Sequence, residues 1–170
     1  RRAIPIQNPL NQDFATMRTT LIPSLLENVS QNNRRQVSDV QFFEFAKVFV
    51  PSYEQRLPQE LERGSGVISG NLGTGTYGNP KQFVDFFDIK GVVEGVLNVS
   101  SVVDYEVGRK RHPTFHPGRC ASINVYGESI CLFGEVHPEV RENYHLINPT
   151  YVFELDFDRL LELAKIDTQF

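Results

Sequence analysis

The sequence predicts an α+β fold in which a mainly antiparallel sheet is flanked by helices. Segments rich in β-branched and aromatic residues gather mostly in the second half of the chain, and stretches with helical spacing interrupt them rather than alternate with them. A two-residue turn signal between two apolar segments adds a hairpin. With 170 residues, 40% of them hydrophobic, residues 1–170 are expected to form one globular domain.

Charge and targeting signals narrow the class of protein. The formal net charge of −4 argues against autonomous nucleic-acid binding, although it leaves room for a local basic patch. No apolar run reaches the length of a membrane span and no signal-peptide pattern opens the chain, so we expect no membrane partner. Two cysteines without a secretory signal indicate a reduced, cytoplasmic setting. Because the chain starts at Arg1 without Met, we expect a fragment of a longer protein.

The first half of the chain predicts a helix between extended segments. Residues 3–7 are extended, and a helix follows over residues 21–33, whose core-facing stripe is Leu21, Ile22, Leu25, Leu26 and Val29. Residues 40–50 (VQFFEFAKVFV) predict a strand, and their imperfect alternation predicts burial on both faces. The remaining segments predict an exposed connection at 52–63, a strand at 66–73, a glycine-rich loop at 72–80, a helix at 81–98 and a strand at 102–107.

A hairpin near residues 120–134 can be placed in register. Gly127-Glu128 is a two-residue turn with glycine first, so Tyr126 lies opposite Ser129. This register puts six residues on one face, namely Ala121, Ile123, Val125, Ile130, Leu132 and Gly134. Cys120 and Cys131 then lie roughly 13 Å apart, whereas a disulfide requires Cα atoms within about 7 Å. We therefore predict free thiols.

A strand over residues 151–157 and a helix over residues 158–165 end the chain. Asp156 or Asp158 is expected to cap this helix. With Glu154 they form an acidic cluster that could hold Mg²⁺, because hard cations bind carboxylates. We favour capping and a solvated rim over a metal site.

Histidines and arginines supply further candidates. Four histidines suggest a metal site, namely His112, His116, His137 and His145, but prolines follow three of them and favour extended corners with local ring contacts, so we predict no metal site. A Cys-His nucleophile is disfavoured because both cysteines lie in apolar strands. The candidate cleft or interface residues are Arg18, Arg119, His116, His137 and Glu135. Arg119 could face a cleft or pair with Glu135, and the basic run at 109–111 is typical of a solvated loop.

Six short motifs occur in a fixed order. They are Asn8-Pro9-Leu10, residues 17–26 (MRTTLIPSLL), residues 43–49 (FEFAKVF), residues 85–91 (DFFDIKG), His116-Pro117-Gly118-Arg119 and residues 134–140 (GEVHPEV). Each is weak alone, but the ordered set is specific and covers nearly the whole chain. It resembles the synthetase-like core of the bacterial phenylalanyl-tRNA synthetase beta subunit.

The resemblance implies a class II aminoacyl-tRNA synthetase fold. It also implies an alpha-subunit partner that carries the active site, in an enzyme of two alpha and two beta chains that uses ATP and Mg²⁺ and binds tRNA. The beta core is implied to be a catalytically silent relative of the alpha core, without catalytic residues, metal or cofactor. The family's editing domain, its magnesium-linked acidic residues and its anticodon-contacting domain are expected outside this chain.

Two active-site motifs of class II enzymes depart here from the catalytic pattern. Motif 2 supplies an arginine for the ATP phosphate, and the matching strand, residues 45–49, ends without one. Motif 3 is Gly-x-Gly-x-x-Arg, and here Arg159 keeps its place while Glu154 and Asp156 replace the glycines. Glycine lets a nucleotide approach the backbone, whereas two like charges about 4 Å apart cost roughly 4 kcal/mol at a surface-like dielectric. Gly134 and His137 are implied to keep their places in the floor of the site.

Three functions follow as expectations. The first is a non-catalytic scaffold that docks the alpha subunit through exposed apolar surface on the 21–33 helix or on a sheet edge. The second is a domain that still binds ATP and activates an amino acid, which Glu154 and Asp156 argue against. The third is a tRNA-binding module, which the net charge argues against and whose basic residues would be Arg34, Arg35, Arg109, Lys110 and Arg111.

Overall fold

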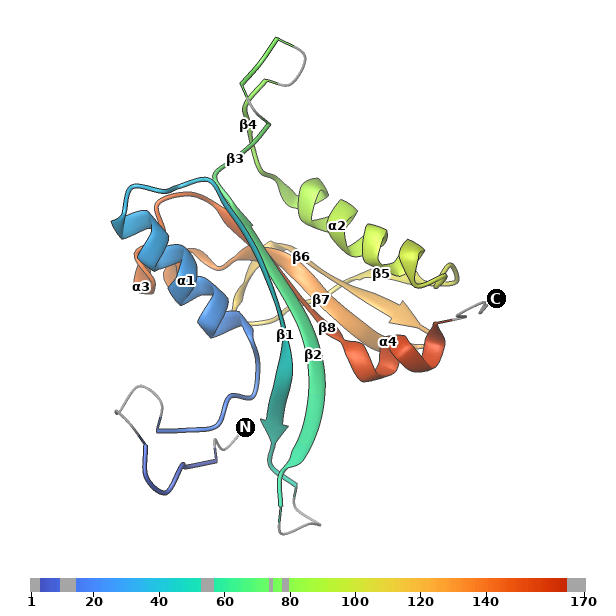
Figure 1. Ribbon diagram of the computed structural model, residues 1–170. Coiled ribbons are helices and arrows are strands. Elements are labelled where there is room, and N and C mark those ends of the chain that lie inside the picture. Colours follow the sequence, from blue (N-terminus) through green and yellow to red (C-terminus); the bar gives the residue numbers. More distant parts are fainter. Residues whose placement is uncertain (1–3, 10–14, 53–56, 74, 78–79, 165–170) are drawn as a thin grey trace, which may run out of the picture.

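A six-stranded antiparallel sheet forms the centre of the molecule, in the strand order β1-β2-β8-β7-β6-β5 (Figure 1). The computed structural model describes residues 4–9, 15–52, 57–73, 75–77 and 80–164. The strands of the sheet are β1 (Val40–Val50), β2 (Gln59–Ser69), β5 (Glu106–Arg109), β6 (Phe115–Val125), β7 (Glu128–Val136) and β8 (Thr150–Asp156). The predicted α+β class with an antiparallel sheet is confirmed.

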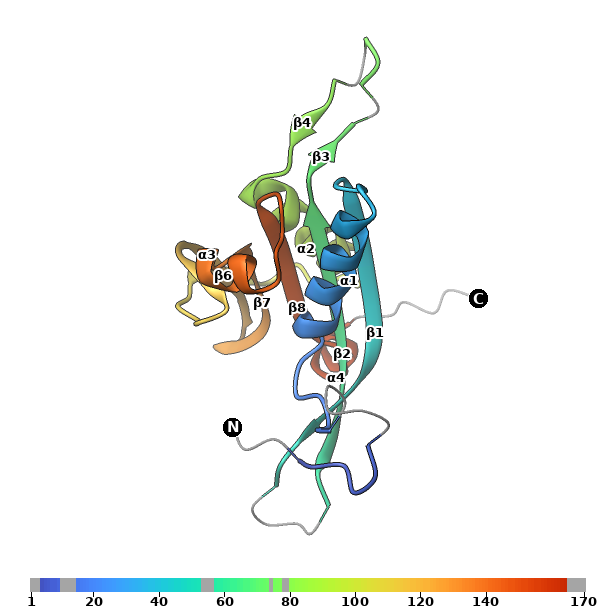
Figure 2. The same cartoon turned by 90° about the vertical axis from the view of Figure 1, so that its left-hand side faces the viewer.

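Helices cover both faces of this sheet. α1 (Ile22–Arg34) and α3 (Pro138–Asn143) lie on one face, and α2 (Phe86–Val99) and α4 (Phe157–Leu163) lie on the other (Figure 2). Each face has its own buried apolar layer, because successive side chains of a strand point to opposite faces. No helix in the described part of the chain is long and apolar enough to cross a membrane.

The predicted helix at 21–33 is α1. Its whole apolar stripe is buried against the sheet, and its outward positions are polar or carry Pro23. The extended segment predicted before it is also present, since Ile6 N donates to Ala15 O and Met17 N donates to Ile4 O. Residue 3 lies outside the described residues.

The helix predicted at 81–98 begins later, as α2. Asp85 accepts hydrogen bonds from the backbone N–H groups of Phe87 and Asp88, and Asp88 accepts one from Asp85 N in return. This reciprocal capping box fixes the first helical residue as Phe86. Residues Gln82–Phe83 instead form β4, which pairs with β3 (Asn71–Leu72) in a small ribbon that projects from the sheet (Figure 1).

The charged segment at 52–63 is not the predicted exposed connection throughout. Gln59–Arg63 begin β2, which pairs with β1 over the full length of both strands, and β2 ends at Ser69 rather than at residue 73. Charged side chains are compatible with a strand here because they pair across the ladder, as Lys47 Nζ does with Glu60 Oε2 at 2.9 Å.

The predicted burial of both faces of the 40–50 strand is wrong. β1 is the outermost strand, and only its side facing α1 is well covered. On the opposite side Phe43 is 83% exposed and Phe45 is 53% exposed. The imperfect alternation therefore marks an edge strand with an exposed aromatic face.

The predicted hairpin register is also wrong. The turn residues are Tyr126 and Gly127, with φ of +51° and +82°, and Val125 pairs with Glu128. Pairing is thus shifted toward the N-terminus relative to the prediction, and an irregularity between Ile123 and Asn124 moves it again. Of the six residues predicted to share a face, Ala121, Ile123, Val125 and Ile130 lie in the layer under α2, whereas Leu132 packs on the α1 side.

The remaining predictions are displaced by a few residues. The strand predicted at 102–107 is β5 at Glu106–Arg109, because Val102 N still bonds to Leu97 O and closes α2. The last strand and helix are β8 and α4, and Asp156 is the residue that caps α4 by accepting from Arg159 N. Residue 165 lies outside the described residues. Both cysteines are free thiols, as predicted, and both are buried.

Candidate functional site

A cleft of about 490 Å³ opens on the α1 face of the sheet. Apolar side chains line part of it, and threonines, one histidine and one carboxylate line the rest. The lining residues are Thr19, Thr20, Ile22, Pro23, Leu26, His112, Thr114, Leu132, Val140, Tyr144 and Glu154. Only one of the candidate motif 3 residues, Glu154, lines this cleft.

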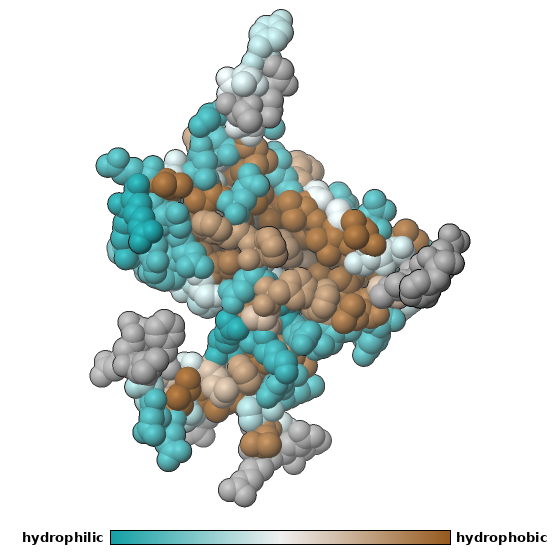
Figure 3. Space-filling model, in the orientation of Figure 1, coloured by the Kyte–Doolittle hydropathy of each residue, from teal (hydrophilic) through white to brown (hydrophobic). Residues whose placement is uncertain are grey.

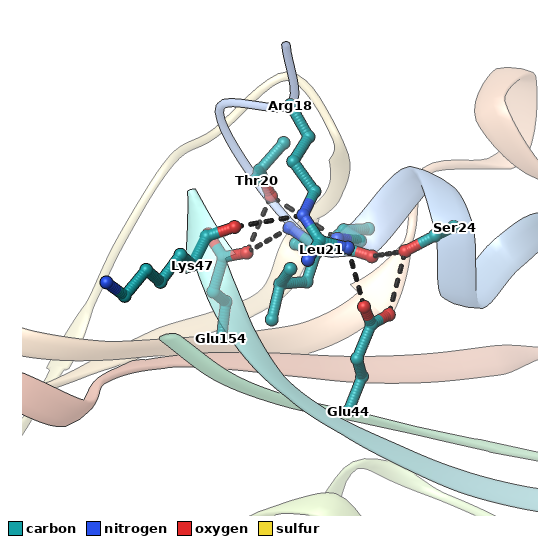
Figure 4. A network of polar contacts seen from close by, with 8 residues as sticks. Arg18, Thr20, Leu21, Ser24, Glu44, Lys47 and Glu154 are labelled. Atoms are coloured by element: carbon teal, nitrogen blue, oxygen red, sulfur yellow. Dashed lines mark hydrogen bonds and ion pairs between the residues drawn. The ribbon is translucent and has the colours of Figure 1, made fainter. Parts of the chain in front are cut away.

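Glu154 is fastened to the start of α1. It projects from β8, and its Oε1 accepts hydrogen bonds of 2.7 Å from both Thr20 Oγ1 and Leu21 N (Figure 4). Leu21 is the N-cap residue of α1 and has no side-chain oxygen of its own to serve as a cap. A carboxylate at a helix N-terminus is stabilised by the unpaired N–H groups and the helix dipole. Glu154 therefore supplies the missing cap from the opposite end of the sequence.

Asp156 and Asp158 are also used within the chain. Asp156 caps α4 and forms an ion pair with Arg63 of β2, and Asp158 Oδ2 accepts from Glu62 N at 2.9 Å. The capping role predicted for Asp156 is confirmed. Across the described residues there is no group of three or more His, Cys, Asp or Glu side chains that could hold a metal ion.

Arg159 does not reach the cleft. Its guanidinium pairs with Glu128 Oε2 at 2.8 Å and with Glu162 Oε2, close to the β6–β7 turn. The hydrogen bond that Arg159 donates to Glu162, with the charge of Glu128, raises the pKa of Arg159 above its usual value. The three residues of the motif 3 pattern thus point to three separate partners instead of converging on one ligand.

Arg18 does not line the cleft and is bonded to β1 instead. Its Nη1 pairs with Glu44 Oε1 at 2.7 Å, and its Nε donates to Lys47 O at 2.9 Å (Figure 4). Ser24 of α1 completes this network by donating to Glu44 Oε2 at 3.0 Å. The side chain of Arg18 is consequently occupied in joining the segment before α1 to β1.

Arg119 pairs with Glu135, which was one of its two predicted roles. The Nε to Oε2 distance is 2.6 Å, and the carboxylate side chain is only 6% exposed. Tyr151 of the neighbouring strand donates to the same carboxylate at 3.4 Å, and burial together with that negative charge raises the pKa of the phenol. Tyr151 belongs to the layer under α2, so this pair lies on the face of the sheet opposite the cleft.

Three histidines share one local structural role. Each precedes a proline, and its Nδ1 accepts the backbone N–H two residues further on, which belongs to Thr114, Gly118 and Glu139 respectively. His112, His116 and His137 therefore stabilise corners of the chain, as their prolines suggested. His137 is in addition the N-cap of α3. Neither His116 nor His137 lines the cleft.

The comparisons with known proteins agree with this fold. Residues 1–157 match the family described as "Phenylalanyl tRNA synthetase beta chain CLM domain". The chain belongs to this family. Proteins named phenylalanine–tRNA ligase beta subunit from Symbiobacterium thermophilum and Clostridium acetobutylicum are 40% and 37% identical to it over 162 and 171 residues. These alignments cover 95% and 100% of this chain, which spans about a fifth of the length of those relatives.

A solved structure shows how far the fold is shared. The pyrrolysyl-tRNA synthetase of Desulfitobacterium hafniense superimposes with a TM-score of 0.63 at 14% identity, covering 86% of this chain and 49% of that one. The predicted class II synthetase-like fold is confirmed. The residues that were predicted to match motif 2 lie in β1, and those predicted to match motif 3 lie in β8 and α4.

Sequence reasoning missed the partners of the motif 3 acids. Glu154 is bound by Thr20 and Leu21, and Asp156 is bound by Arg63. None of these three partners was a candidate site residue. The sequence predicts that Arg63 lies in a connection, so no pairing with Asp156 is expected. In the structure Arg63 belongs to β2 and lies directly opposite Asp156. Extending the strand to residue 59 would have exposed this cross-strand pair of opposite charges.

Proposed function

We propose that this chain is a non-catalytic, class II synthetase-like domain of a phenylalanine–tRNA ligase beta subunit, which supports phenylalanyl-tRNA synthesis by docking the catalytic alpha subunit. The observation that carries the proposal is the use of Glu154 and Asp156. They stand where a catalytic motif 3 has glycines, and both are engaged within the chain. ATP and Mg²⁺ are used by the complete cytoplasmic enzyme of two alpha and two beta chains, and not by this domain.

Glu154 and Asp156 stabilise the fold, so replacing them by the glycines of a nucleotide-binding motif 3 would destabilise the domain. A glycine at position 154 would remove the cap of α1, and a glycine at position 156 would remove both the cap of α4 and the partner of Arg63. With Glu154 in place, a triphosphate entering the cleft meets a carboxylate of like charge, and no arginine lines the cleft. The domain thereby keeps the class II framework while its site is closed to the reaction.

The docking surface is the exposed face of β1. Two docking surfaces were expected, the α1 helix and a sheet edge. Every apolar side chain of the α1 stripe is buried, so that helix offers a partner only a polar surface. The sheet edge is therefore the docking surface. Phe43 and Phe45 stand on the outward side of β1, opposite Gly66 and Gly64 of β2. Figure 3 shows apolar side chains gathered on the face that carries α2 and the β1–β2 pair. Exposed aromatic side chains on a flat strand pair are typical of a protein interface.

Co-purification tests the dock. Phe43→Ser/Phe45→Ser is made in the full-length beta subunit, which is co-expressed with a tagged alpha subunit, and the beta chain retained per alpha chain is measured. Loss of two central aromatic contacts should weaken assembly at least about tenfold. The matched control is Tyr126→Asn, which removes another exposed aromatic ring at the β6–β7 turn and should leave assembly intact. Equal retention of both variants would contradict the dock.

Calorimetry tests the silence of the site. The full-length beta subunit without alpha is titrated with ATP and with phenylalanine, and no heat of binding is expected in the micromolar range. Micromolar binding of both ligands would favour the alternative function, a domain that retains amino-acid activation.

A further inference from the structure

A second cleft, of about 430 Å³, lies at the other edge of the sheet. Its lining residues are Arg109, Lys110, Arg111, Pro117, Gly118 and Cys120. β5 is the outermost strand here, and the cleft opens between its end and the first residues of β6. We call it the basic cleft.

The cations of the basic cleft have no carboxylate partner among the residues that the structure describes. Most of the other described lysines and arginines form ion pairs, whereas Arg109, Lys110 and Arg111 form none, and all three are exposed. In a chain with a net charge of −4, three consecutive unpaired cations concentrate positive potential at one place.

The backbone around the basic cleft is fixed by its own contacts. Lys110 N donates to Cys120 O at 3.2 Å, so the basic segment is held against β6 beyond the last residue of β5. On the other wall Gly118 N donates to His116 Nδ1 at 3.1 Å, and Pro117 has no N–H. The pairing of β6 with β7 is interrupted between Phe115 and Cys120, which gives this wall its shape.

Charged side chains are the strongest donors that the basic cleft offers a ligand. The backbone N–H groups of Lys110 and Gly118 are already used, and the charged donors are two guanidinium groups and one ammonium group. Arginine forks bind phosphate oxygens in bidentate fashion, and lysine adds a point charge. The floor is the buried thiol of Cys120, whose pKa burial raises to about 11, so it is neutral and adds no negative charge.

We infer that the basic cleft binds phosphate groups of an RNA chain. The inference deepens the proposed function, since a tRNA is the phosphate-bearing macromolecule that such a ligase handles. The cleft lies at the β5 edge, at the opposite end of the sheet from the proposed dock on β1. An RNA strand can thus occupy it while the alpha subunit is bound. With three cations and no base-reading groups, the cleft positions the RNA without selecting its sequence.

The test uses the assembled ligase that contains the full-length beta chain. Arg109→Ser/Lys110→Ser/Arg111→Ser is compared with Lys81→Ser/Lys90→Ser/Arg141→Ser, which changes the net charge equally at positions outside the basic cleft. Binding of a fluorescently labelled phenylalanine tRNA transcript is measured by anisotropy over a series of salt concentrations. The cleft variant should bind at least about tenfold more weakly at 0.1 M salt, with a salt-dependence slope reduced by about 2. The control should change affinity less than about twofold.

Three results would overturn the inference. They are an unchanged affinity of the cleft variant, an equal loss in the control, and a loss of labelled polyglutamate binding in the cleft variant while its tRNA binding is kept, which would assign the cleft to an acidic protein. Gel filtration with the alpha subunit separates this outcome from failure of the proposed dock, because the cleft variant should still assemble. If the triple variant does not fold, Arg111→Ser alone should reduce the slope by about 0.7.

Discussion

The two edges of the sheet differ in the side chains that they present to solvent. β1 carries Phe43 and Phe45 on an exposed face, whereas β5 ends in the consecutive cations of the basic cleft. Both are outer strands of the same antiparallel sheet, and each has a neighbouring strand of the sheet on one side only. The segment before α1 bonds to part of the other side of β1, through Phe49 N and Lys47 O. An unpaired strand edge is open to association, and its side chains determine what associates.

The side chains that are available to bind other molecules lie at the two edges of the sheet and not at its centre. In the middle of the sheet, Glu154, Asp156 and Glu135 are each satisfied by partners in the chain. At the edges, aromatic rings and cations remain available to other molecules. The centre of the fold therefore holds the domain together, and the two edges are left for partners of different chemistry.

A glycine-to-alanine substitution behind the basic cleft should lower the free energy of unfolding far more than one near the β1 edge. A Cβ at Gly134 would lie 2.2 Å from Arg119 O and 2.9 Å from Cys120 Cα, which are backbone atoms behind the basic cleft. Gly134→Ala should lower the free energy of unfolding by about 3 kcal/mol or more, because the ladder itself must move.

Gly66→Ala is the matched substitution near the β1 edge. Its Cβ would lie 2.5 Å from the ring edge of Phe153, which is a side chain and can rotate, so a loss of about 1–2 kcal/mol is expected. Urea unfolding of the chain measures both. A larger loss for Gly66→Ala than for Gly134→Ala would contradict the assignment of the tighter contact.

The two aromatic residues of β1 should differ in their effect on stability. Phe45 contacts Phe157 of α4 edge to face, with 4.1 Å between ring centroids, and it lies over Gly64. Phe45→Ser should cost about 1–2 kcal/mol, whereas Phe43→Ser should change the free energy of unfolding by less than about 0.5 kcal/mol. If Phe43→Ser proves as destabilising as Phe45→Ser, the side chain of Phe43 has a role in the folded chain and is not reserved for a partner.

Acid should loosen the start of β1 and leave the β5 edge unaffected. The hydrogen bond from Lys81, with those from Asn71, lowers the pKa of Asp39 from 3.8 to about 2. A lowered pKa means that the folded state favours the carboxylate, so its stabilisation is present above about pH 4 and is lost as the pH falls toward 2. The Tm difference between the wild type and Asp39→Asn should be largest at pH 7 and should shrink as the pH is lowered to 2. A difference that does not change with pH would refute the ion pair.

The smallest effect concerns the floor of the basic cleft. Cys120 is 6% exposed and its raised pKa keeps the thiol neutral, although Lys110 acts in the opposite direction. Iodoacetamide at pH 8 should modify neither Cys120 nor Cys131 in the folded chain and both of them in urea, as read by mass spectrometry. Rapid labelling of native Cys120 would show an accessible thiolate and an open floor.

Local signals allowed the sequence to predict α1, β1, β8 and α4, because apolar spacing and β-branched content decide those elements within a few residues. The start of β2 could not be predicted in this way. Its charged residues are stabilised by cross-strand partners such as Lys47, which only the paired sheet provides. The hairpin register failed for a related reason, since Tyr126 adopts a positive φ that its residue type does not suggest.

The candidate site was predicted only where its partners were neighbours in a ladder. Arg119 and Glu135 were recognised because they were expected on adjacent strands. The separation of Glu154, Asp156 and Arg159 was not, because it depends on α1, β2 and the β6–β7 turn arriving from distant parts of the sequence. Sequence spacing alone placed these three residues in one motif and could not show that they point apart.

The contact between Glu154 and Leu21 also bears on how the chain folds during synthesis. The two residues are 133 positions apart, and β2 must likewise wait for β8 before it gains its second neighbour. The first helix consequently emerges from the ribosome long before its cap exists. Folding dominated by such distant pairings is slow, because the loops must close before the contacts are gained. Until then the apolar side chains of β1 that face α1 in the folded chain, such as Val40 and Phe42, stay uncovered, so early access to a chaperone or to the partner subunit matters most for this part of the nascent chain.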